Sequence, residues 1–480
     1  MSNYKLNVKR TIFVGFAFFL ISAFWQAYDA IVPLMLTNHF GLSQTASGAI
    51  MALDNIFALF MLPIFGTLSD KSKSKHGKRT PFIFLGTVAA IVAFIALTFV
   101  DNYQLTLLSD EIKALYPVGV EDKATKEAML AVVIEKTLEV TLANPWPLVF
   151  FIGILLIALF SMATFRSPAV ALMPDVTIKP LRSKGNAIIN LMGTAGGIFV
   201  LVLGMVFKTS SDKNSYMKYT WYIVAVCAIM AIGLAIFLLF VKEKRWNSEM
   251  LEIQEKLDKE TQDETTSVAE EKLPKEKLKS LLLILASVAL WFMGYNAVTS
   301  KYSLYAQNVL NQDYNFTLII AQAAAVISYV PVGIVAGKFG RKKTILAGVA
   351  MLATAFFGAI FITPTTPPIV MYLLFALAGI AWATINVNSF PMVVELARGS
   401  NIGKYTGFYY TASMSAQVLT PILSGSIMDL FGSMHPLFPY ATVFVSLSFV
   451  TMLFVKHGNV QDLGDKTAKD LIADNFAGED

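Results

Sequence analysis

Twelve long apolar runs dominate this 480-residue chain. About 20 consecutive apolar residues are enough to cross the hydrocarbon core of a bilayer as a helix. Lipid satisfies no backbone hydrogen bonds, so segments of this kind must span as helices. The sequence therefore predicts an all-α polytopic membrane protein. The runs expected to span are 11–36, 46–69, 80–101, 147–174, 185–207, 219–241, 279–306, 315–337, 343–363, 368–396, 403–430 and 437–456.

The composition agrees with a membrane protein. Hydrophobic residues make up 55% of the chain and charged residues 15%, whereas soluble domains carry about 25% charged residues. The net charge of +5 is too small to indicate a nucleic-acid partner. The single cysteine, Cys227, rules out an internal disulfide. The first run is too long for a signal peptide and lacks a small-residue cleavage site, so we keep it as the first helix.

A polar segment follows the sixth run and divides the chain. We expect an N-terminal six-helix bundle at 1–241, a linker at 242–278, a C-terminal six-helix bundle at 279–457 and a tail at 458–480. Basic loops follow every even-numbered run but the last. The positive-inside rule then places both termini and the linker in the cytoplasm of a bacterial cell, with the spans in its cytoplasmic membrane. The acidic loop 102–146 is either a helix resting on the outer membrane surface or a disordered loop.

Two loops in equivalent places repeat a pattern. "GTLSDKSKSKHGKRTPF" (66–82) closes the second run, and "GIVAGKFGRKKT" (333–344) closes the eighth. Positive-inside charge explains the basic residues but not the matched glycines. Internal repeats of this kind are typical of secondary transporters, which hold their substrate between the halves. The pattern resembles the cytoplasmic loop motif of the major facilitator superfamily, whose fold is two six-helix bundles that rock about a central cavity.

The resemblance implies gating residues at the helix ends. It implies that Asp70 bridges to a neighbouring helix end near Gly403. Gly337 stands where the second copy would carry an acid, so this role is implied in one half only. The gating set is Asp70, Gly77, Lys78, Arg79, Asp175, Arg182, Lys301, Gly340, Arg341, Glu395 and Arg398.

Two further stretches narrow the resemblance. "FRSPAVALMPDVTIKPLRSKGNAIINLMGTAGG" (165–197) and "GIAWATINVNSFPMVVELARGSNIGKYTG" (379–407) are similar to the glycoside–pentoside–hexuronide:cation symporter family, and most similar to its branch of sucrose and maltose carriers. The resemblance covers both halves but not the loop 102–146 or the linker. It implies a sugar substrate, such as maltose, sucrose or another di- or oligosaccharide, that moves with a cation.

Two acids lie deep inside the predicted spans, away from their ends. Asp29 lies eight residues before Thr37 and Asp54 eight residues after Ala46, at the outer ends of their helices, roughly 12 Å deep at 1.5 Å per residue. Repulsion and desolvation in a shared layer would favour the neutral form of at least one, as a proton-coupled carrier needs. The alternative is that either acid only completes a local polar contact. Related melibiose carriers use sodium and have a second carboxylate one turn further, where this chain has Ala58, so a proton is favoured over sodium.

Two cations also lie within spans, and each has competing interpretations. Arg166 offers five donors that suit sugar hydroxyls or an acid, but it can equally form a structural ion pair. Lys301 lies late in the seventh run, at the level of the two acids. It can extend to the outer surface or pair with Asp29 or Asp54. The pairing would also suit a facilitator that moves no ion.

Amide and aromatic side chains on several runs suggest a sugar site. Amides pair with neighbouring hydroxyls, and an indole stacks on the apolar face of a sugar ring. Membrane helices also use such residues simply to pack, so only the whole set favours a sugar. The substrate-binding candidates are Trp25, Gln26, Tyr28, Asn55, Arg166, Tyr295, Asn296, Trp382, Asn386, Asn388, Tyr409 and Gln417.

Other protein classes fit less well. All four histidines lie near predicted helix ends, away from any membrane haem or di-iron centre, and there is no glycine-rich phosphate loop. We expect no enzyme activity, metal or bound cofactor. The sequence predicts a monomeric carrier in lipid that imports a sugar by proton symport through alternating access. A sodium symporter, a facilitator, a drug exporter and a non-transporting sugar sensor remain alternatives.

Overall fold

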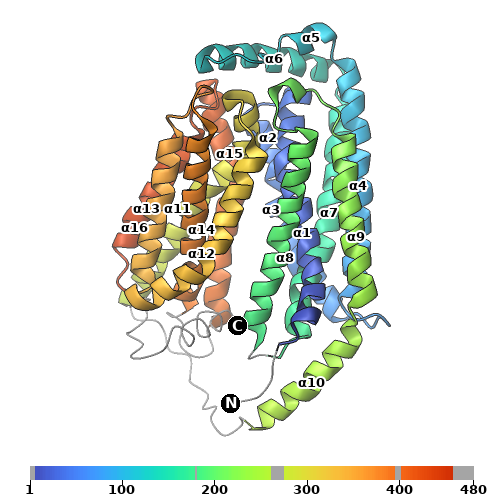
Figure 1. The fold of residues 1–480 in the computed structure, drawn as a ribbon, viewed down its shortest axis with the longest axis vertical. Coiled ribbons are helices and arrows are strands. Elements are labelled where there is room, and N and C mark those ends of the chain that lie inside the picture. Colours follow the sequence, from blue (N-terminus) through green and yellow to red (C-terminus); the bar gives the residue numbers. More distant parts are fainter. Residues whose placement is uncertain (1–5, 179–180, 261–274, 395–401, 458–480) are drawn as a thin grey trace.

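A computed structural model describes residues 6–178, 181–260, 275–394 and 402–457, and within those ranges the regular elements are all helices. They pack as two groups side by side (Figure 1). The first group contains α1 (Val8–Leu34), the π-helical turn η1 (Met35–His39), α2 (Gln44–Met51), α3 (Leu53–Asp70), α4 (Thr80–Leu107), α7 (Trp146–Asp175), α8 (Arg182–Phe207) and α9 (Thr220–Phe240). The second contains α11 (Lys275–Tyr305), the π-helical turn η4 (Ala306–Leu310), α12 (Tyr314–Phe339), α13 (Arg341–Ala359), α14 (Pro368–Val394), α15 (Ile402–Phe431) and α16 (Leu437–Leu453).

The helices follow the predicted spans. Among the described residues, nine helices are long and apolar enough to cross a membrane, counting α1 with η1, α2 with α3, and α11 with η4 as single spans. The bent helix α12 is a tenth, with a 51° bend next to Pro331, where a proline removes a backbone hydrogen bond. The 30-residue α15 and the shorter α16 occupy the two remaining predicted positions.

The two ends of the molecule differ. The short α5 (Asp110–Ala114) and the long α6 (Lys123–Ala143) lie across one end, which we call the α6 end (Figure 1). The opposite end carries the start of α1, the lysine-rich loop 71–79 and the polar helix α10 (Glu243–Glu260), and we call it the basic end.

The equivalent helices α1 and α11 end alike. Each runs into a π-helical turn, η1 or η4, at the α6 end. The two turns bond to each other across the groups: Asn38 Nδ2 donates to Gln307 Oε1 over 3.0 Å, and Asn308 Nδ2 donates to Asn38 Oδ1 over 2.8 Å. A shared irregularity at matched positions supports the internal repeat seen in the sequence.

Helix α6 answers the open question about the loop 102–146. A helix is present, capped by Asp122, whose side chain accepts from Thr125 N. It packs on the protein, because Thr141 Oγ1 donates to Phe40 O over 2.9 Å in the first group, and Lys123 Nζ donates to Tyr305 OH over 2.9 Å in the second. The helix therefore bridges the two groups.

At the basic end, α10 is bonded to the start of α4. The Glu243 carboxylate accepts from the backbone N–H groups of Arg79 and Thr80, each over 2.8 Å. This carboxylate satisfies amides that a helix start leaves free. Gly77, at φ +121°, lies so close to Glu243 that a Cβ would overlap its side chain. The linker therefore begins with a helix, α10, that is bonded to the first group.

Candidate functional site: a cavity between the two helix groups

A cavity of about 870 Å³ lies between the groups. Its walls come from α1, α7 and α8 of the first group and from α11, α12, α13 and α14 of the second. Its lining reaches toward the basic end, because it includes Asn186, four residues after the start of α8, and Gly333, six residues before the end of α12. At the α6 end, hydrogen bonds between the groups close the space above it.

Many of the predicted site residues meet in this cavity. They come from both groups, and their side chains combine a carboxylate, a guanidinium, two amides and three aromatic rings. The predicted residues that line the cavity are Trp25, Gln26, Asp29, Arg166, Tyr295, Trp382 and Asn386. Their roles in binding stay predictions.

Other predicted substrate contacts are not part of the lining of this cavity, and their roles in binding also stay predictions. Tyr28 is fully buried, with its hydroxyl 3.5 Å from Met51 O. Asn388 is buried and donates to Thr384 O over 2.9 Å. Neighbouring positions on a helix point in different directions at 3.6 residues per turn, so a cluster in sequence does not share one face. The residues outside the lining are Tyr28, Asn55, Asn296, Asn388, Tyr409 and Gln417.

The two acids interact but occupy different places. Asp29 lines the cavity, whereas Asp54 lies outside the lining and accepts from Asn55 Nδ2 over 2.7 Å. The carboxyl groups of Asp29 and Asp54 interact electrostatically, and Arg166 interacts with Asp54. The guanidinium of Arg166 also lies 5.6 Å from the ring of Trp25, within range of a cation–π contact. The acids and Arg166 thus form one charged cluster at the cavity wall.

One aromatic face of the cavity is already covered. The rings of Tyr295 and Trp382 are stacked with centroids 3.8 Å apart and planes 8° apart, and Phe292 meets Trp382 edge-on at 5.4 Å. A sugar ring can therefore stack on Trp382 only from the face opposite Tyr295 in this conformation.

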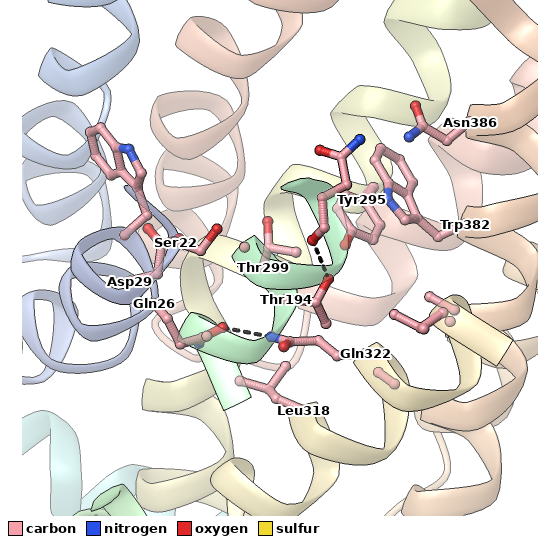
Figure 2. Close-up of a pocket in the computed structure, with 18 of the residues that line it drawn as sticks. Ser22, Gln26, Asp29, Thr194, Tyr295, Thr299, Leu318, Gln322, Trp382 and Asn386 are labelled. Atoms are coloured by element: carbon pink, nitrogen blue, oxygen red, sulfur yellow. Dashed lines mark hydrogen bonds between the residues drawn. The ribbon is translucent and has the colours of Figure 1, made fainter. Parts of the chain in front are cut away.

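The sequence analysis missed several neutral polar residues of the lining. Asn186, Asn190 and Thr194 follow one another at four-residue spacing and so share a face of α8. On α1, the missed Ser22 lies four residues before Gln26, which lies three before Asp29, so these three also share a face (Figure 2). This spacing was visible in the sequence, but single polar residues in apolar runs gave no reason to choose them. Gln322 of α12 and Thr299 of α11 complete the missed polar set shown in Figure 2.

The structure contradicts both interpretations of Lys301, extension to the outer surface and pairing with an acid of the predicted pair. It is fully buried and its Nζ donates to Gln44 O over 2.9 Å, so it neither reaches the surface nor pairs with Asp29 or Asp54. It interacts instead with Asp429, whose carboxylate accepts from the backbone N–H of Gln44 over 2.8 Å. The lysine therefore lies where α2 of the first group meets α15 of the second.

The predicted gating residues at the basic end are held by local contacts. Arg79 pairs with Asp70 and, over 2.7 Å, with Asp175. Asp70 is thus bonded within its own loop, and because residues 395–401 lie outside the described ranges, the implied bridge to the helix end near Gly403 stays a prediction. Arg182 donates to Pro174 O over 3.2 Å.

The remaining gating predictions give little further geometry. Lys78 is exposed, and Gly340, at φ +85°, precedes the start of α13 at Arg341. Glu395 and Arg398 lie outside the described residues.

Comparison with known proteins identifies the family. The family model for the Major Facilitator Superfamily matches residues 10–112, 128–421 and 311–470, which together are most of the chain. The chain belongs to this superfamily. An uncharacterised MFS-type transporter of Methanocaldococcus jannaschii is 28% identical over 299 residues, which cover 60% of this chain and 68% of that protein.

Solved structures of the superfamily share the fold. The inward open conformation of the xylose transporter XylE from E. coli aligns with a TM-score of 0.62 and 15% identity, over 97% of this chain and 99% of that one. The nucleoside transporter NupG aligns with a TM-score of 0.56 and 14% identity, over 93% and 99%. At such identities the likeness shows the major facilitator fold alone. Family and fold together make this chain a membrane transporter and not an enzyme.

Proposed function

We propose that this major facilitator protein imports a sugar together with a proton. One observation carries the proposal: a single cavity joins a carboxylate, Asp29, to amides and aromatic rings supplied by both helix groups. Alternating access needs a site that both halves share. The sucrose and maltose carriers that the chain resembles supply the substrate class, a di- or oligosaccharide.

The polar lining suits a hydroxylated ligand. The indole N–H of Trp25 is buried and has no acceptor among the described residues. An unpaired buried donor costs about 1–3 kcal/mol, and a ligand hydroxyl or a water can accept from it. Gln26 and Asn386 offer both donors and acceptors to neighbouring hydroxyls.

The charged cluster suits proton coupling. A proton on Asp29 would remove its repulsion with Asp54, and a proton on Asp54 would release Arg166 from its acid. Each change alters the cavity wall without any bound metal. Ala58, one turn after Asp54, offers no second carboxylate for sodium on α3.

We place the basic end in the cytoplasm, because its loops carry the lysine-rich segment 71–79 and α10. The described conformation then faces inward. Single cysteines at Lys78 and Glu139, both exposed, test this orientation in a Cys227→Ser background. A membrane-impermeant thiol reagent should label Glu139→Cys from outside intact cells and Lys78→Cys only after lysis. The reverse pattern would overturn the orientation.

The coupling experiment uses the protein in liposomes loaded with a pH dye. Maltose, and in a second series sucrose, is added without an imposed gradient to wild type, Asp54→Asn and Asp29→Asn. Glu252→Gln, which removes an exposed carboxylate of α10, is the matched control. We expect sugar-dependent acidification in wild type and control. It should be lost in at least one of the variants Asp29→Asn and Asp54→Asn while sugar exchange continues.

Other outcomes would contradict parts of the proposal. Sugar entry with no proton signal would leave a facilitator. A signal that requires external sodium would make sodium the coupling ion. Failure of every sugar tested to enter would overturn the substrate class.

A further inference from the structure

One hydrogen bond inside the cavity joins the two helix groups. Gln322 Nε2 on α12 donates to Gln26 Oε1 on α1 over 2.7 Å, and both residues line the cavity. Figure 2 shows the two amides pointing toward each other across the cavity. The bond leaves Nε2 of Gln26 and Oε1 of Gln322 for other partners.

The space around this pair is limited but usable. A Cβ on Gly197 of α8 would lie 3.2 Å from Gln322 Oε1 and 3.6 Å from Gln26 Oε1. The glycine therefore leaves the edge of the amide pair uncovered by side chain. A residue with a side chain at 197 would occupy the space that a ligand hydroxyl needs.

The pair also lies next to the cavity acid. Gln26 and Asp29 are three residues apart on α1, and both line the cavity, so they share a helix face. A ligand group bound to Gln26 is then within a turn of the carboxyl that we assign to the proton. Substrate and proton would meet on one side of α1.

We propose that Gln26 and Gln322 form the subsite that recognises two neighbouring hydroxyls of the substrate, and that those hydroxyls replace the amide-to-amide bond. This inference rests on the proposed function, because it needs a hydroxylated substrate. In the empty cavity the bond links α1 to α12. In the loaded cavity the sugar takes over both amides, so occupancy removes a direct link between the two groups.

A purely structural amide contact is the competing account, since interhelical amide bonds are common in membrane proteins. The two accounts differ in one respect. A structural contact affects all substrates equally when it is removed. A recognition subsite distinguishes a sugar that has the hydroxyls from one that lacks them.

The experiment compares variants and deoxysugars in liposome counterflow. The variants are Gln322→Leu, Gln26→Leu and the shorter amide Gln322→Asn. Gln254→Leu is the matched control, because Gln254 is half-buried on α10, outside the cavity lining and outside every predicted binding set. The probes are maltose and maltoses that each lack one hydroxyl. Hydrogen bonds of this kind change affinity by about tenfold.

We expect Gln322→Leu and Gln26→Leu to raise KM for maltose about tenfold, with maximal exchange nearly unchanged. For the deoxymaltose that lacks the recognised hydroxyl, wild type and variant should have the same KM. Gln322→Asn should resemble Gln322→Leu, because its amide is too short to reach Gln26. An equal KM increase for maltose and every deoxymaltose, or the same increase in Gln254→Leu, would overturn the subsite.

A measurement without ligand separates this inference from the proposed function. Spin labels on α2 and α15 report whether the α6 end is open in the empty protein. Gln322→Leu, but not Gln254→Leu, should shift the distances, because it removes the link in the empty state. If wild type transports neither maltose nor sucrose, the proposed function and the hydroxyl subsite both fail, and unchanged distances would overturn the link as well.

Discussion

Two contacts between the helix groups close the α6 end, and they differ in chemistry. Counting six spans per half, the contact of α2 with α15 and the contact of α8 with α12 occupy equivalent places. We call them the α2/α15 seam and the α8/α12 seam. Each joins one helix of the first group to one of the second.

The α2/α15 seam is built from backbone and charge. Cβ atoms on Gly48 and Gly425 would overlap the backbone carbonyls of Pro421 and Gln44, respectively. The Asp429 carboxylate accepts from two backbone N–H groups at the start of α2, and Lys301 is buried beside it. The helices touch where only glycine fits, and an acid caps a helix of the opposite group.

The α8/α12 seam is built from side chains. Tyr314 OH donates to Thr209 Oγ1 over 2.7 Å, and Gln307 Nε2 donates to Thr209 O over 2.8 Å. A Cβ on Gly204 would meet the side chain of Asn315, not backbone. These contacts join neutral groups that can rotate away. The two halves of the fold are repeats, but the interactions that close the two seams are not. The α2/α15 seam depends on close backbone packing and charge, whereas the α8/α12 seam depends on adjustable hydrogen bonds.

The largest expected effect is a change of volume in the α2/α15 seam. Gly425→Val should prevent closure, because its side chain meets the backbone of Gln44, which cannot rotate away. Overpacking of this kind costs roughly 1–3 kcal/mol. Spin-label distances should show an open α6 end, and liposome exchange should fall at least tenfold. Gly204→Val in the other seam is the control and should cost less. Equal losses in both variants would remove the distinction between the seams.

A smaller effect should follow from removing charge. Asp429→Asn keeps the size of the side chain but weakens the cap of α2 and leaves Lys301 without its acid, so we expect a shift toward the open α6 end of about 1 kcal/mol. Tyr314→Phe in the α8/α12 seam removes one neutral hydrogen bond and is the comparison. Salt screens only those charges that solvent can reach. The shift toward the open α6 end caused by Asp429→Asn should therefore become smaller at high salt only when solvent reaches the α2/α15 seam. A larger shift in Tyr314→Phe would reverse the assignment of chemistry to the seams.

The smallest effect concerns pH at α6. Glu127 Oε2 lies 2.7 Å from His435 Nε2 of the second group, with Lys123 nearby. Burial raises the pKa of Glu127 to about 7 and lowers the pKa of His435. When α6 is released, the pKa of Glu127 returns to about 4.3 and the pKa of His435 to about 6.5.

The signs of these two shifts oppose each other. Glu127 binds its proton more tightly when α6 is packed than when it is released. The contribution of Glu127 to the packing of α6 therefore becomes weaker as pH rises from about 4.3 to about 7. His435 binds its proton less tightly when α6 is packed than when it is released. The contribution of His435 to the packing of α6 therefore becomes stronger as pH rises toward about 6.5. His435→Gln should leave α6 looser at neutral than at acidic pH, and Glu127→Gln should do the opposite. Hydrogen exchange of α6, corrected for the intrinsic pH effect, measures both, and the same trend in both variants would contradict this account.

The sequence was sufficient for the spans because lipid imposes one clear pattern on each helix. It also placed Trp25, Asp29 and Trp382 in one cavity, since large polar and aromatic groups in apolar runs are conspicuous. It did not indicate where the side chains of Lys301 and Tyr28 lie, because the direction of a side chain depends on helix rotation and on partners far away in sequence. Gln322 was missed for a related reason: its meaning depends on Gln26, nearly 300 residues away.

Helix α6 has a mechanical consequence. Its C-terminal part is bonded to Phe40 of the first group, and its N-terminal part to Tyr305 and His435 of the second. It therefore connects the two groups in parallel with the two seams. When the groups separate at that end, α6 carries part of the load, and the weaker of its two attachments must break first. A binding protein that reinforces the weaker attachment would arrest the carrier without entering its cavity.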